Sequence, residues 1–141
     1  MANVIPFAFR GELFTGTHNF ASGGDSFKLA LYTSNPYNTS STVYVTNNEV
    51  SSSGTNYTAA GNALSGNAVV AATAVASCDF NDSQWTSATI TATHAALYND
   101  DQSDKLCVVL DFGGSFTCTN GTFKVSFPNP STASNAIISM A

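Results

Sequence analysis

The chain has 141 residues, of which only 9% are charged, and its formal net charge is −5. This length fits one domain that can bury an autonomous hydrophobic core. The four basic residues are spread along the chain, so the clustered cations that bind nucleic-acid phosphates are missing. We find no run of about 18 apolar residues and no secretory leader pattern. The sequence therefore predicts a soluble protein made in the cytosol, with neither nucleic acid nor membrane as a partner.

The N-terminal segment has the spacing of a short helix. Phe9, Leu13 and Phe20 recur at intervals of four and seven residues, and Pro6 suits a first helical turn. We predict a helix over residues 7–15. This helix or arm, residues 1–24, precedes a single β-domain over residues 25–141.

From Phe27 onward, short apolar runs of period two alternate with clusters of Asn, Gly, Ser and Asp, which indicates strands and turns. About eight strands follow, with no helical periodicity between them, and they favour an all-β fold: a single β-sandwich of jelly-roll or immunoglobulin-like type. The predicted strands are residues 27–31, 43–46, 68–75, 85–92, 95–98, 106–112, 123–127 and 136–139.

Turn residues lie between these runs. We predict turns at residues 99–104, 113–114, 120–121 and 128–130, because each stretch is rich in Asn, Asp, Gly or Pro. Asn120-Gly121 is the strongest hairpin signal in the chain. Residues 34–42 and 49–58 are polar and unpatterned, and we interpret them as exposed loops.

Cys78, Cys107 and Cys118 show no CxxC spacing. One disulfide is formally possible, but buried free thiols on strands are the favoured interpretation. A zinc site would need a fourth ligand, for which His94 is the nearby candidate, and we predict no metal.

The residues that could carry catalysis do not form a recognisable motif. No G-x-S-x-G turn surrounds a serine, so we interpret His94 as a structural imidazole and His18 as a cap or partner contact. Only Glu12 and Glu49 are glutamates, which leaves few candidates for a paired-carboxylate mechanism. The aspartates of residues 100–104 are able to bind Ca²⁺, but they are also ordinary turn residues. We predict a protein that is not an enzyme and holds no cofactor.

The aromatic residues allow two interpretations. Trp85 with Tyr32, Tyr37 or Tyr57 would form a sugar-stacking platform in a lectin-like protein. Packing of the aromatic side chains into a sandwich core is the simpler alternative, and we favour it.

Several segments together resemble a known family. They are residues 2–6, 10–13, 27–34, 46–50, 96–99 and 109–114. In these segments the chain resembles small β-sandwich virion structural proteins of tailed bacteriophages, of the capsid cement or decoration type.

The resemblance implies a subunit on the capsid surface, made in the host bacterial cytoplasm, that stabilises the head shell by binding across capsomers. Its partners would be the major capsid protein and copies of itself, with a trimer as one arrangement of the homo-oligomer. A structural subunit associated with the neck, tail or fibre, or a glycan- or receptor-binding module, is the alternative.

The N-terminal segment is the candidate partner contact. Val4, Ile5, Phe7 and Phe9 make it apolar, and Arg10 adds one positive charge. It would serve either as a docking arm or as a lid over the open end of the sandwich.

Overall fold

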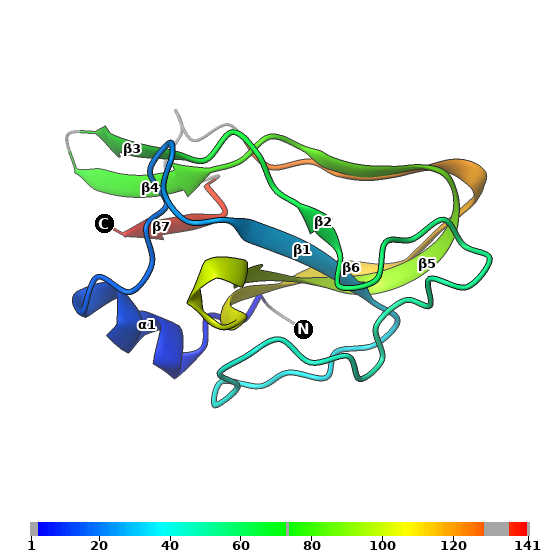
Figure 1. Ribbon diagram of the computed structural model, residues 1–141, viewed down its shortest axis with the longest axis horizontal. Helices are drawn as coiled ribbons and strands as arrows, with labels where there is room; N and C mark the ends of the chain where they lie inside the picture. Colours follow the sequence, from blue (N-terminus) through cyan, green and yellow to red (C-terminus); the bar gives the residue numbers. More distant parts are fainter. Residues whose placement is uncertain (1–2, 73, 129–135, 141) are drawn as a thin grey trace.

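The computed structural model describes residues 3–72, 74–128 and 136–140, and within them it shows one α-helix, one short 3-10 helix and two antiparallel sheets packed together. One sheet has the strand order β2-β1-β5-β6 and the other has the order β3-β4-β7. The predicted all-β sandwich with a short N-terminal helix is confirmed (Figure 1). The elements are α1 (Phe7–Phe14), β1 (Phe27–Tyr32), β2 (Asn62–Ala63), β3 (Ala68–Ala72), β4 (Val75–Asp79), β5 (Ser83–Asn99), the 3-10 helix η1 (Asp100–Gln102), β6 (Lys105–Val125) and β7 (Ile138–Met140).

The two longest strands, β5 and β6, form a hairpin that closes through η1. In Figure 1 this hairpin curls at one end of the molecule, and its outer half returns above β1 and β2. The curl is possible because the pairing contains four register shifts, and such irregularities bend and twist a strand. The β5–β6 hairpin thereby folds its outer half back over β1 and β2, while both of its strands remain in the four-stranded sheet.

The turns predicted at Gly113-Gly114 and Asn120-Gly121 are wrong, because β6 continues through both. Gly113 and Asn120 do adopt the positive φ values that a turn would require, +76° and +48°. They lie where the pairing with β5 shifts register, so the same backbone conformation produces bulges instead of chain reversals. The turn predicted over residues 99–104 is confirmed, whereas the one at 128–130 falls largely outside the described residues.

The other predicted elements are mostly found, with changed limits. The helix and the first strand are confirmed as α1 and β1, and β7 includes most of the last predicted strand. Residues 85–92 and 95–98 belong to one strand. The single strand predicted at 68–75 contains all of β3 but only the first residue of β4, and residue 73 between them lies outside the described residues. A strand at 43–46 is wrong, because Val43 makes only an isolated bridge to the start of β6. The loops at 34–42 and 49–58 contain no strand or helix.

The main core lies between the two layers and under α1. Phe20 and Phe27 stack with their ring centroids 4.5 Å apart, and Phe80 meets Phe27 edge-on at 5.5 Å. Trp85 is buried between Tyr57 and Phe123. The core interpretation of the aromatic side chains is thus confirmed.

A second core covers the opposite face of β1, β5 and β6. The hydroxyls of Tyr32 and Tyr37 lie 2.6 Å apart, and Tyr32 donates to the Val45 carbonyl at 2.8 Å. Burial raises the pKa of Tyr32 far above its usual value, so this hydroxyl stays protonated. Residues 34–50 are therefore a loop that covers the sheet, and the central strands are buried on both faces.

Gly61 marks a close approach between the chain entering β2 and the backbone of β1. Its φ is +84°, and a Cβ atom there would lie 2.0 Å from the carbonyl oxygen of Leu29. Only glycine fits this position without displacing β1.

Candidate interaction surface

The structure divides the five residues predicted as partner contacts into an inner and an outer set. Val4 pairs with the backbone of β6, and Phe9 is completely buried in the main core. Phe9 therefore packs into the domain in this structure and does not lie on its surface. Ile5 is partly buried, whereas Phe7 and Arg10 are exposed. The segment packs against the domain, as the lid alternative requires.

A polar network fastens α1 to the domain. Lys105 Nζ donates to one oxygen of Glu12 at 2.6 Å, and His18 Nε2 lies 2.8 Å from the other. Burial raises the pKa of the Glu12 carboxyl, but these two hydrogen bonds outweigh burial and hold the pKa below its usual value. The ionised carboxylate of Glu12 thus links α1 to the start of β6, through Lys105, and to the loop that follows α1, through His18.

His18 has a defined hydrogen-bonding role in this network. Asn99 accepts from the Asp101 backbone N–H through Oδ1, which leaves its Nδ2 to donate to Asp25 at 2.8 Å and to His18 Nδ1 at 3.0 Å. Because Nδ1 accepts, Nε2 carries the proton that is donated to Glu12. His18 is buried inside the domain, and its ring nitrogens contact the side chains of Glu12 and Asn99, so it does not cap the backbone of α1.

An apolar groove of about 360 Å³ separates α1 from β7, and we call it the α1–β7 groove. Phe14 is 93% exposed and Met140 is 59% exposed at its rim, while Phe7, also 59% exposed, lies under the Arg10 guanidinium. These three belong to the six large apolar side chains that are exposed among the described residues. The groove is lined by Ile5, Phe9, Arg10, Leu13, Phe14, Ile138, Ser139 and Met140.

Arg10 is the basic residue without a carboxylate partner in the part of the chain that the structure describes. Its guanidinium donates to the Ile5 carbonyl at 3.2 Å. By contrast, each of the three lysines makes an ion pair of 2.6–2.9 Å with an aspartate or glutamate. An exposed guanidinium beside an apolar groove suits a partner that carries a carboxylate.

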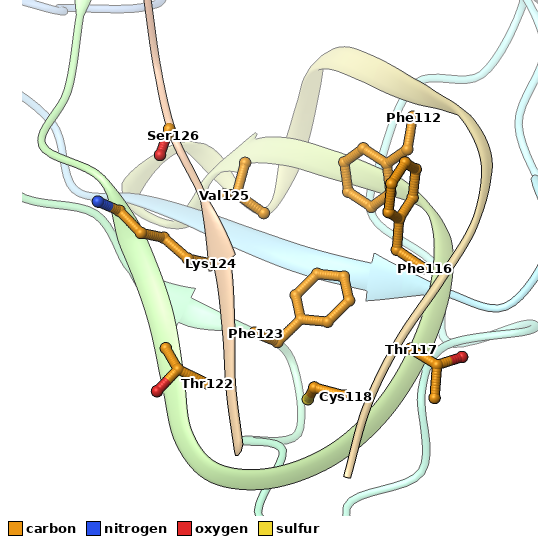
Figure 2. Close-up of a pocket in the computed structure, with 9 residues that line it drawn as sticks. All are labelled: Phe112, Phe116, Thr117, Cys118, Thr122, Phe123, Lys124, Val125 and Ser126. Carbon is orange, nitrogen blue, oxygen red and sulfur yellow. The ribbon is translucent and has the colours of Figure 1, made fainter.

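A second hollow of about 410 Å³ lies between two stretches of β6 on either side of its outer bulge. Figure 2 shows the rings of Phe112 and Phe116 together on one side, with Phe123 facing them from the returning stretch. Phe116 is more than half exposed, and the only charged side chain in the lining, Lys124, pairs with Asp82 at 2.7 Å. This hollow offers an aromatic wall but no convergent polar groups. Its lining is Phe112, Phe116, Thr117, Cys118, Thr122, Phe123, Lys124, Val125 and Ser126.

A third hollow, of about 550 Å³, is polar, and we call it the polar hollow. None of its lining residues is charged. They are Ser52, Gly54, Thr55, Asn56, Tyr57, Thr58, Ser87, Thr89 and Asn120.

One cluster has the arrangement of a nucleophilic triad, in which a thiol, an imidazole and a carboxylate contact one another in turn. Cys107 Sγ lies 3.9 Å from His18 Nδ1, and His18 Nε2 contacts Glu12. The thiol is completely buried, and burial raises its pKa well above the usual value. A buried neutral thiol is neither accessible nor nucleophilic, so this arrangement is structural. All three cysteines are free and lie on strands, as predicted, and Cys78 and Cys107 are buried, whereas Cys118 is only partly buried.

The remaining residues considered for chemistry have ordinary structural partners. His94 Nδ1 lies 2.7 Å from Thr93 Oγ1, which donates to the Thr33 carbonyl at 3.0 Å. In the loop of residues 100–104, Asp100 pairs with Lys28 and Asp101 accepts from a backbone N–H. Among the described residues, no group of three or more His, Cys, Asp and Glu is arranged to hold a metal ion.

Comparison with known proteins does not assign the chain to a family. The chain matches no protein-family model, and no curated protein or solved structure matches it significantly. Within the described residues, no helix has the length and apolar character that a membrane span requires. The class that the structure defines is thus an all-β sandwich with a short helix packed on it.

Proposed function

We propose that this chain is a structural protein of a tailed bacteriophage particle, a cement subunit that stabilises the head shell by binding across neighbouring capsomers. The resemblance of its sequence to small virion proteins supports a place in a phage particle. The exposed apolar side chains on its surface support a role in binding another protein. The partners would be the major capsid protein and further copies of the chain.

The α1–β7 groove carries this proposal. Exposed apolar patches on soluble domains mark sites of protein interaction. Phe14 is the most exposed of the large apolar side chains that the structure describes. Complete burial of such a ring against a partner contributes about 2–3 kcal/mol. Phe7 and Met140 enlarge the apolar area on either side of it.

The groove is also held in a fixed shape before any partner binds. Phe9 anchors α1 in the core, and Glu12 ties it to Lys105 and His18. A surface that is already ordered loses little conformational entropy on binding. Arg10 adds a charged contact for a carboxylate on the partner.

Recombinant protein added to undecorated shells tests the proposal. Co-sedimentation and a raised melting temperature of the shells are expected, because the subunit binds only the assembled state. Phe14→Ser should abolish both effects, whereas Phe116→Ser, a matched change at an exposed phenylalanine outside the groove, should leave them intact.

Absence of binding, or equal loss with both variants, would contradict the proposed role. The copy number per particle, measured by mass spectrometry of virions, separates the alternatives. A copy number proportional to the number of capsomers supports a cement subunit. A copy number equal to the symmetry of the tail, or a small multiple of it, supports a place in the neck, tail or fibre.

A further inference from the structure

The polar hollow is assembled from three segments that are distant in sequence. They are the loop of residues 52–58, residues 87–89 of β5, and Asn120 at the outer bulge of β6. Its volume of about 550 Å³ is within the range of small-molecule sites, which is roughly 300–1,000 Å³.

Hydrogen bonds hold the three segments together. The Thr89 N–H donates to the Thr55 carbonyl at 2.9 Å, and Asn56 Nδ2 donates to the Thr86 carbonyl at 3.2 Å. The Asn120 N–H donates to Thr89 Oγ1 at 3.1 Å, which joins β6 to the same wall. The hollow is therefore rigid before a ligand arrives.

Unusual backbone conformations concentrate around this hollow. Asn56, Ser87 and Asn120 have φ values of +61°, +49° and +48°, and Gly54 has +70°. For residues other than glycine this region costs about 1–2 kcal/mol each. Such strain persists where the surrounding structure imposes it, and it gathers at ligand sites.

Several side chains of the hollow are exposed and have no internal partner. In the part of the chain that the structure describes, the side chains of Ser52, Thr58, Ser87 and Asn120 make no hydrogen bond to another protein group. Three hydroxyls and one amide supply both donors and acceptors. They line a concave surface without any charge.

From this geometry we propose that the polar hollow binds a neutral carbohydrate unit. Sugar hydroxyls both donate and accept hydrogen bonds, as do the hydroxyl and amide groups that line the hollow. A charged ligand would find no compensating charge there, and its desolvation would oppose binding. This site is separate from the α1–β7 groove, and its existence does not depend on the role proposed for that groove.

The test is titration of the ¹⁵N-labelled protein with neutral disaccharides (lactose, maltose, cellobiose and chitobiose), with glucuronic acid as a charged comparator. At least one neutral disaccharide should give saturable amide shifts confined to residues 52–58, 87–89 and 120. The double variant Ser87→Gly/Asn120→Gly deletes two hydrogen-bonding side chains but keeps a residue that tolerates positive φ. Its affinity should be roughly tenfold weaker, because two ligand hydrogen bonds are lost.

Asn48→Gly is the matched control, because Asn48 also has a positive φ and lies outside the hollow. It should bind like the wild-type protein. Thr58→Val, an isosteric change at an exposed loop residue, provides a second test if the double variant folds poorly. The proposal is overturned if no neutral disaccharide shifts these amides, if glucuronic acid binds as tightly, or if the hollow variants keep wild-type affinity.

Discussion

Replacing Phe9 with alanine should destabilise the domain strongly, because this side chain is the apolar anchor of α1. Phe9 is completely buried, and its ring lies 5.1 Å from His18 and 6.1 Å from Phe20. Removing a buried phenylalanine ring costs roughly 3–5 kcal/mol. A domain of this length has an unfolding entropy of about 0.3 kcal/mol/K, so a loss of about 4 kcal/mol lowers the melting temperature by roughly 13 °C.

Thermal unfolding followed by circular dichroism, together with urea denaturation, measures this change. Phe14→Ala is the matched control, because it makes the same substitution in the same helix at a side chain that is 93% exposed. Its free energy of unfolding should change by no more than about 0.5 kcal/mol. If Phe9→Ala cost less than about 1 kcal/mol, or if both variants cost the same, α1 would be a detachable arm and the argument for a fixed groove would fail.

Three further outcomes follow from the structure. The contribution of Glu12 to the free energy of unfolding should be complete above the ordinary carboxyl pKa near 4.5 and should fall as the pH drops through the lowered pKa of Glu12. Glu12→Gln should flatten that fall, and an unchanged slope in acid denaturation curves would refute the assignment. Gly61→Ala should cost more than about 3 kcal/mol, against about 1 kcal/mol for Gly54→Ala, because both glycines have positive φ but only Gly61 abuts the β1 backbone. In a thiol-labelling assay Cys118 should react before Cys107, since burial raises the pKa of Cys107 and hides its sulfur; the reverse order would contradict the described packing.

Local patterns predicted the element types better than they predicted the ends of the elements. The alternation at residues 27–31 and the spacing of the helix reflect burial of one face, which is a local property of the chain. The bulges at Gly113 and Asn120 could not be distinguished from turns, because both structures use the same positive φ. Only the long-range pairing with β5 decides between them, and local composition does not report it.

The candidate surfaces were also only partly predictable, because local sequence does not report long-range contacts. The sequence showed that the N-terminal segment is apolar. Its spacing did not predict that Phe9 is buried in the core while Phe14 is exposed. The polar hollow left no signal, because its Ser, Thr and Asn residues resemble those of every other loop. They form a site only where residues 52–58 meet the bulged β5–β6 hairpin.

The β5–β6 hairpin also bears on how quickly the chain folds. Its strands are joined by a short turn around η1, so they can begin to pair with little loss of loop-closure entropy. β3 and β4 are likewise neighbours in sequence, whereas β1 and β7 must find partners far along the chain. Local contacts of this kind speed folding. Because β5 and β6 make up half of the four-stranded sheet, a single connection of a few residues joins two of its four strands.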